Sequence, residues 1–112
     1  MRILLDECVP RRLRQQLSDH DVRTVAEVGW AGRKNGELLQ LMSGQGFEVL
    51  LTVDQSIRHQ QNLRARRISL VVLTGSTKWS LVRQHADRIA AAAVASATPG
   101  SYVEIEIPFE PK

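Results

Sequence analysis

The chain begins with Met1-Arg2-Ile3-Leu4-Leu5-Asp6-Glu7, and a similar stretch, Val49-Leu50-Leu51-Thr52-Val53-Asp54, follows near its middle. Each stretch is a short apolar run, of the length of a β-strand, that stops at an acidic residue. In open α/β sheets, ligands bind at the carboxyl ends of the strands, near the point where the strand order reverses. The two stretches therefore predict parallel strands that carry Asp6 and Asp54 at one edge of a sheet.

Strand-like and helical patterns alternate along the whole chain. We expect strands over residues 2–5, 22–25, 48–53, 68–73 and 102–107, and helices over residues 10–18, 35–45, 56–64 and 78–97. This alternation predicts an α/β fold in one domain over residues 1–112, a three-layer sandwich around a mostly parallel sheet of about five strands. We expect the strand order 2-1-3-4, with the last strand at an edge and its direction open.

Individual residues in these patterns give further expectations. In the helix over residues 35–45, the spacing of Leu38, Leu41 and Met42 predicts the buried face. Pro10 suits the first position of the helix over residues 10–18.

The composition is that of an ordinary globular domain. The chain has 112 residues, of which 43% are hydrophobic and 24% are charged, so one hydrophobic core is within reach. Its single cysteine, Cys8, excludes an internal disulfide and a multi-cysteine zinc site, and we expect Cys8 to be buried, as free cysteines usually are. No apolar run reaches the roughly 18 residues that a membrane span needs. We therefore expect a cytoplasmic protein of bacterial type.

The formal net charge is +3, and arginines follow both acidic strand ends. Arg11, Arg12 and Arg14 come after the first, and Arg58, Arg64, Arg66 and Arg67 come after the second. Such clusters are typical of proteins that bind phosphate-rich partners, although a solvated arginine-rich surface explains them equally well. Aromatic residues do not alternate with these arginines, so base stacking on an aromatic platform is not indicated.

The acids at the strand ends suit a divalent metal. Mg²⁺ and Mn²⁺ prefer hard oxygen ligands, usually a few carboxylates together with water and substrate phosphate. Asp6 and Asp54 are the candidate metal ligands and catalytic carboxylates. Glu37 is a third catalytic candidate, although an acid in the first turn of a helix also stabilises the helix through its dipole.

Neutral and basic side chains near the acids are candidate substrate contacts. The amides of Gln60, Gln61 and Asn62 can donate and accept hydrogen bonds, or they can satisfy nearby backbone groups instead. Arg11, Arg12 and Arg58 are the basic candidates for this role. We assign Thr52 to packing or to a backbone hydrogen bond.

Several motifs, taken in order, resemble the short bacterial PIN-like domain proteins. The matching motifs are Leu4-Leu5-Asp6-Glu7 followed by Pro10, Asn35 to Leu39, Thr52-Val53-Asp54, and Gln60-Gln61-Asn62-Leu63. The resemblance implies an α/β fold, a cluster of acids that holds Mg²⁺ or Mn²⁺ and cleaves RNA, and in many relatives a toxin role in a toxin–antitoxin pair. Asn35 and Ser56 occupy positions at which relatives with a larger acidic cluster carry acids, so the resemblance favours a one-metal site over a two-metal site.

Three interpretations stay open. The first is a metal-dependent ribonuclease, and the second is a related domain without catalysis that binds RNA or a small antitoxin-like protein. The third is a receiver-like phosphoacceptor centred on Asp54, with Thr74 at a strand end, although the lysine expected after the fifth strand is absent. Residues 90–97 and the strand over residues 102–107 suggest a homodimer as a further possibility.

Overall fold

The computed structural model describes residues 2–33, 35–54, 67–95 and 100–109 of the chain. The strands in these residues are β1 (Arg2–Leu5), β2 (Asp21–Thr24), β3 (Val49–Thr52), β4 (Ser69–Gly75) and β5 (Tyr102–Ile107). The helices are the 3-10 helices η1 (Arg11–Leu17) and η3 (Arg83–His85) and the α-helices α1 (Asn35–Gly44), α3 (Trp79–Val82) and α4 (Ala86–Ala95). The predicted helix over residues 56–64 lies outside the described residues.

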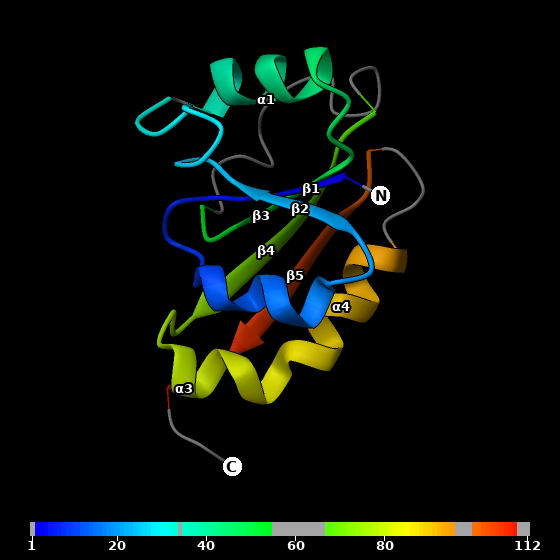
Figure 1. Cartoon of the computed structure of the whole chain (residues 1–112). Coiled ribbons are helices and arrows are strands. Elements are labelled where there is room, and N and C mark those ends of the chain that lie inside the picture. The colour runs from blue at the N-terminus through cyan, green and yellow to red at the C-terminus, as the bar shows by residue number, and fades with distance from the viewer. Residues whose placement is uncertain (1, 34, 55–66, 96–99, 110–112) are drawn as a thin grey trace.

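The five strands form one sheet in the order β2-β1-β3-β4-β5 (Figure 1). All four neighbouring pairs are parallel, which confirms the predicted α/β class and strand order and gives β5 its direction. All four residues of β3 are buried. A strand covered by helices on both faces of a parallel sheet is typically apolar along its length, as Val49 to Leu51 are, since neither face meets water.

Helices cover the two faces of the sheet, as the predicted three-layer sandwich requires (Figure 1). On one face, α1 packs Leu38, Leu39 and Met42 against apolar side chains of the central strands. On the other face, η1, α3 and α4 enclose a second cluster, which includes Leu13 and Ile89. The sheet is therefore the middle layer between two separate apolar cores.

Several details differ from the expectations. Leu39 takes the buried position predicted for Leu41, because the buried face of α1 is centred one residue earlier. The helix after Pro10 is a 3-10 helix that Pro10 precedes. The long helix predicted over residues 78–97 is divided into α3, η3 and α4 over its described part.

Cys8 is exposed, so its predicted burial is wrong. The chain turns after β1, where the Val9 N–H donates to the Asp6 carbonyl at 3.1 Å. This turn directs Val9 into the core, and Cys8 is left at the surface.

The order of the strands creates a switch point between β1 and β3. The chain leaves β1 for β2, which lies on one side, and it leaves β3 for β4, which lies on the other. Ligands of open α/β sheets bind in the crevice that such opposite exits create at the carboxyl ends of two neighbouring strands. Asp6 and Asp54 follow these two strands, so the fold places both acids where the sequence predicted them.

Candidate active site

The site is built on the carboxyl ends of β1 and β3. Leu5 lies opposite Leu51 in the register of these strands. Past the end of β1, the Asp6 N–H still donates to the Leu51 carbonyl at 2.9 Å. The backbone of Asp6 is therefore fixed to the neighbouring strand, and its side chain begins from a rigid position.

Thr52 connects the two predicted acids. Its side chain is fully buried, and its hydroxyl donates to Oδ2 of Asp6 at 2.7 Å. The Thr52 hydroxyl oxygen, Oγ1, also accepts the backbone N–H of Asp54 at 3.2 Å. One buried hydroxyl thus bonds the carboxylate that follows β1 and the backbone that follows β3, and it links the two segments that carry Asp6 and Asp54.

The predicted packing and backbone hydrogen bond of Thr52 are confirmed by its burial and by its bond with the Asp54 N–H, whereas its bond to the Asp6 carboxylate was not predicted. Thr52 follows Leu51 as Asp6 follows Leu5, and these two leucines lie opposite each other in the register of β3 and β1. The alignment of the two apolar runs was therefore the available signal for the contact between Thr52 and Asp6.

The orientation of the Asp6 carboxylate is fixed at both oxygens. Oδ1 accepts the N–H of Glu7 at 2.8 Å, and Oδ2 accepts the hydroxyl of Thr52. A carboxylate oxygen has two acceptor positions, so each keeps one for a ligand. The carboxylate is therefore held in place and still able to bind a cation.

Glu7, the acid beside Asp6, holds a loop in place. Its Oε1 accepts the backbone N–H of Gly32 at 2.9 Å. Gly32 belongs to the connection between β2 and α1, and its φ of +82° is one that glycine adopts readily. Glu7 therefore ties this connection to the end of β1.

Glu37 is occupied by a neighbour on the surface. It stands in the first turn of α1, and its carboxylate pairs with Nη1 of Arg33 at 2.8 Å, with about half of both side chains exposed. Among the residues that the structure describes, no three or more His, Cys, Asp or Glu side chains are grouped closely enough to hold a metal. The structure thus joins Asp6 and Asp54 through Thr52 but does not bring Glu37 into a three-ligand group with them.

Only some of the candidate substrate contacts belong to the residues that the structure describes. Arg11 and Arg12 are exposed in the first turn of η1, which begins five residues after Asp6. Arg58, Gln60, Gln61 and Asn62 lie outside the described residues, and so does Ser56.

The donor set at the strand ends fits a hard divalent cation. Mg²⁺ is commonly bound through one or two carboxylates, while water and substrate phosphate complete its shell. Asp6 and Asp54 supply two carboxylates, and the hydroxyl of Thr52 already orients the first.

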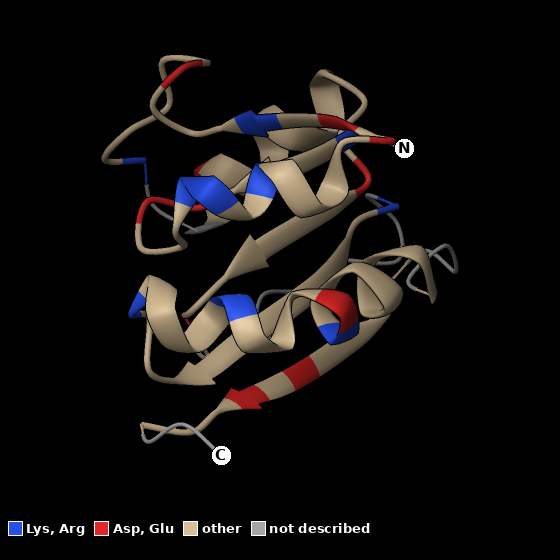
Figure 2. Cartoon of the chain, turned by 60° about the horizontal axis from the view of Figure 1, so that its bottom comes forward, with Lys and Arg blue, Asp and Glu red and all other residues tan. Residues whose placement is uncertain are grey.

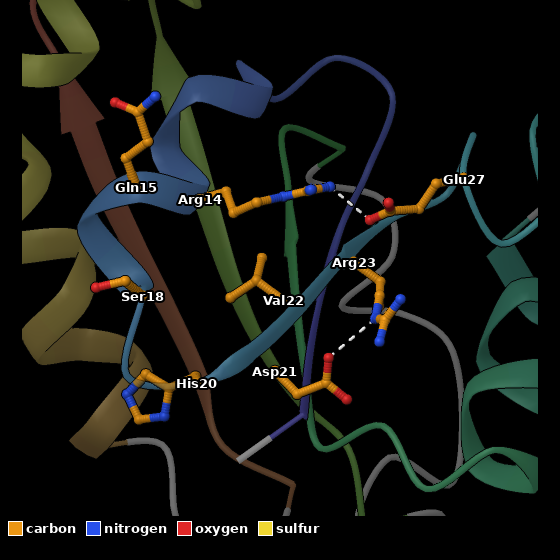
Figure 3. A pocket seen from close by; sticks show the side chains of 8 residues that line it. All are labelled: Arg14, Gln15, Ser18, His20, Asp21, Val22, Arg23 and Glu27. Carbon is orange, nitrogen blue, oxygen red and sulfur yellow. Dashed lines mark hydrogen bonds and ion pairs between the residues drawn. The ribbon is translucent and has the colours of Figure 1, made fainter.

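A pocket of about 430 Å³ lies away from these acids, beside η1 and β2 (Figure 3). Its cations are paired, since Arg14 contacts Glu27 and the Nε of Arg23 contacts Asp21 at 2.9 Å. The hydrogen bond from Arg23 lowers the pKa of Asp21, and the same bond raises the pKa of Arg23. Because its charges are balanced and neither Asp6 nor Asp54 lines it, this pocket is separate from the candidate active site.

Comparison with known proteins gives one match. A family model described as a PIN like domain matches residues 1–75. The match contains Asp6, Thr52 and Asp54, and it ends at the last residue of β4. No curated protein and no solved structure matches the chain.

Proposed function

Since the chain belongs to the family of PIN-like domains, which are typically nucleases, we propose that it is a metal-dependent ribonuclease. The observation that carries the proposal is the buried hydroxyl of Thr52, which bonds the Asp6 carboxylate and the Asp54 N–H at the switch point of the sheet. Preorganised polar groups of this kind are typical of sites that bind and react with a ligand.

Asp6 and Asp54 are the proposed ligands of Mg²⁺ or Mn²⁺. The bound ion would supply a water of lowered pKa and would offset the charge that develops on a phosphodiester. The Thr52 hydroxyl is hydrogen-bonded to Oδ2 of Asp6 and so fixes the orientation of this carboxylate. Its remaining acceptor positions therefore point in a fixed direction. Asp54 completes the pair of carboxylates from the adjoining strand.

The remaining roles concern the substrate and the proton. Arg11 and Arg12 contact phosphates at the start of η1, and Arg58 and the amides of residues 60–62 extend these contacts in the proposal. Glu37 is the proposed general base. It has to leave Arg33 first, and a phosphate bound by Arg33 would release it.

The domain extends to residue 112 in this proposal, although the family match ends at residue 75. β5 pairs with β4 along six residues, and α4 packs against η1. The segments after the match thus complete the same sheet and the same helical layer.

None of the helices in the described parts of the chain has both the length and the apolar character that a membrane span requires.

A binding module without catalysis is the second candidate. The absence of a group of three metal-binding side chains among the described residues favours it, because a cation held by two carboxylates binds weakly until a phosphate adds oxygens. In its more specific form, the nuclease proposal makes this chain the toxin of a toxin–antitoxin pair, with a small antitoxin-like protein as its partner. A second copy of the chain is the other candidate protein partner, and the exposed Val94 on α4 lies in the segment predicted for it. The receiver-like interpretation gains no support from the family.

Cleavage of single-stranded RNA in Mn²⁺ tests the nuclease proposal. We expect Asp6→Asn and Asp54→Asn each to lower the cleavage rate by about 100-fold or more, a loss typical of removing a group that acts on the reacting atoms. Asp19→Asn is the matched control, because it removes one exposed carboxylate away from the site and should leave the rate unchanged. Equal cleavage by all four proteins would indicate a contaminating nuclease and would overturn the proposal.

A further inference from the structure

Ion pairs divide the basic side chains that the structure describes into two groups. In the first group, each arginine contacts a carboxylate: Arg2, Arg14, Arg23 and Arg33. In the second group, all side chains are exposed and none forms a salt bridge in the described part of the chain: Arg11, Arg12, Arg67, Lys78, Arg83 and Arg88. The second group contains the cations that are available to an external anion.

Five of these six available cations belong to one layer of the fold. Arg11 and Arg12 lie on η1, while Lys78, Arg83 and Arg88 lie at the start of α3, on η3 and on α4. Figure 2 shows the basic segments of η1 and of α3 to α4 on the same side of the molecule. η1 contains no acid and Asp87 is the one acid of α3 to α4, so this layer carries a clear excess of positive charge.

The basic layer begins at the edge of the sheet that carries the acids. η1 starts after the turn that follows Asp6, and α3 starts after the carboxyl end of β4. At this second start, Ser76 Oγ accepts the N–H of Lys78 at 3.0 Å, and Ser76 itself is buried. The backbone of Lys78 is therefore held near the carboxyl edge, and the helices lead away from that edge.

We propose that the layer of η1 and α3 to α4 is a docking face for the phosphate backbone of an RNA strand, with Lys78 and Arg83 as its contacts beyond the catalytic edge. The identification of the anion as RNA rests on the proposed ribonuclease function. Lys78 and Arg83 lie after residue 75, where the family match ends, so membership of the family assigns them no role.

The spacing of the cations suits a strand of phosphates. Lys78, Arg83 and Arg88 follow one another at intervals of five residues, at the start of α3, on η3 and on α4. The cations thus recur along the layer as phosphates recur along a strand. The large aromatic of this layer, Trp79, packs against the core and is only partly exposed, so phosphates rather than bases are recognised. The face should therefore bind RNA with little sequence preference.

The pocket beside β2 offers a contrast. An anion there would have to displace Glu27 from Arg14 or Asp21 from Arg23 (Figure 3). Charge-assisted pairs of this kind compete with an incoming phosphate, whereas Lys78 and Arg83 have no carboxylate to release among the residues that the structure describes. The two regions of the surface thus differ in their availability to phosphate although both contain arginines.

The test compares two double variants with the same change in charge. Lys78→Gln with Arg83→Gln alters the proposed face, and Arg23→Gln with Arg67→Gln alters exposed cations elsewhere. Binding of a fluorescent single-stranded RNA is measured in EDTA, in an Asp6→Asn background, between roughly 50 and 200 mM salt. These conditions remove cleavage and leave only binding.

We expect the first double variant to bind about tenfold or more weakly, and the slope of log K against log salt to fall in size by about 1.4, or 0.7 for each lost phosphate contact. The second double variant should keep the affinity and slope of the Asp6→Asn protein. Equal losses in both double variants, or no loss in the first, would overturn the inference. Displacement of RNA by polyglutamate at equal charge concentration would assign the face to an acidic protein segment and would also overturn it.

The outcome for the face is separable from the outcome for the nuclease. If the wild-type protein cleaves RNA while Lys78→Gln with Arg83→Gln binds normally, the face is wrong and the nuclease stands. If no protein cleaves RNA but binding depends on Lys78 and Arg83, the face stands and the catalytic proposal fails.

Discussion

At the scale of single residues, the hydroxyl of Thr52 is the smallest group on which the candidate active site depends. Its hydroxyl is buried and makes two hydrogen bonds, to the Asp6 carboxylate and to the Asp54 N–H. Removal of the hydroxyl takes away both hydrogen bonds, and a hydrogen bond contributes about 0.5–1.5 kcal/mol to stability, or about 1.5–3 kcal/mol when one partner is charged, as Asp6 is. Asp6 and Asp54 were predictable from their positions after apolar runs, and the contact of Thr52 with Asp6 was predictable from the alignment of these two runs. The engagement of Glu37 by Arg33 was not predictable, because an i, i+4 pair is only one of the conformations open to exposed side chains.

The role of Thr52 can be separated from its packing by two substitutions. Thr52→Val keeps the shape but removes the hydroxyl, so we expect the cleavage rate to fall by about 10- to 100-fold, as for other groups that orient a metal ligand. Thr52→Ser keeps the hydroxyl and loses one methyl group, so it should retain most of the rate at a stability cost of about 1 kcal/mol. The dependence of the rate on Mn²⁺ concentration should shift in Thr52→Val but not in Thr52→Ser. A normal Mn²⁺ dependence in Thr52→Val would contradict the positioning role.

At the scale of elements, strands were easier to predict than helices. A parallel strand buried on both faces needs a continuous apolar run, and Val49 to Leu51 is such a run. The long helix was less predictable because its interruption by η3 depends on how Leu81, Val82 and Ala86 fit the sheet beneath them. Cys8 was mispredicted for a similar reason, since the turn after Asp6 determines which of two neighbouring residues enters the core.

The contact between the ends of β4 and β5 gives a prediction about Gly75. Its φ is +83°, and a Cβ atom there would lie 2.2 Å from the Ile107 carbonyl oxygen, which also accepts the Ser76 N–H at 2.9 Å. Gly75→Ala should therefore lower the free energy of unfolding by about 2–4 kcal/mol, from backbone strain together with the clash.

Two glycines provide controls for this effect in urea unfolding. Gly29 has a φ of +80° with nothing near a Cβ, so Gly29→Ala should cost only about 1 kcal/mol of strain. Gly44 lies in α1 without a positive φ and has open space, so Gly44→Ala should be neutral or stabilise the protein by up to about 1 kcal/mol. Equal stability of the Gly75→Ala and Gly44→Ala proteins would show that β4 and β5 separate at this point without cost.

At the scale of the whole molecule, the distribution of ion pairs organises the surface. Arg2 reaches Asp21 across 19 positions of sequence, and Arg14 reaches Glu27 across 13. Sequence alone indicated arginine clusters but not which arginines are neutralised, because these pairs form only after the fold brings distant segments together. The fold neutralises Arg2, Arg14 and Arg23 around β2 and leaves Arg11 and Arg12 of η1 and the cations of α3 to α4 available.

The pair of Arg23 with Asp21 makes stability depend on pH in a defined direction. The hydrogen bond from Arg23 lowers the pKa of Asp21 in the folded protein, and the contact with Arg2 lowers it further. A carboxyl group whose pKa is lowered by folding stabilises the folded state above its unfolded pKa, about 3.9, and loses this contribution as the pH falls through the folded pKa. We therefore expect the unfolding free energy of the wild type to fall with decreasing pH more steeply in this acid range than that of Arg23→Gln.

The measurement is urea unfolding between neutral pH and the acid range, together with an NMR titration of the Asp21 carboxyl. Arg23→Gln should raise the pKa of Asp21 while the Arg2 contact keeps part of the shift. High salt should reduce the difference between the two proteins, because both side chains are about half exposed and the pair is screened. Arg67→Gln removes an exposed cation that has no carboxylate partner among the described residues, so its pH profile should match that of the wild type. If Arg67→Gln changed the acid limb as much as Arg23→Gln does, net charge rather than the Arg23–Asp21 pair would account for the pH dependence.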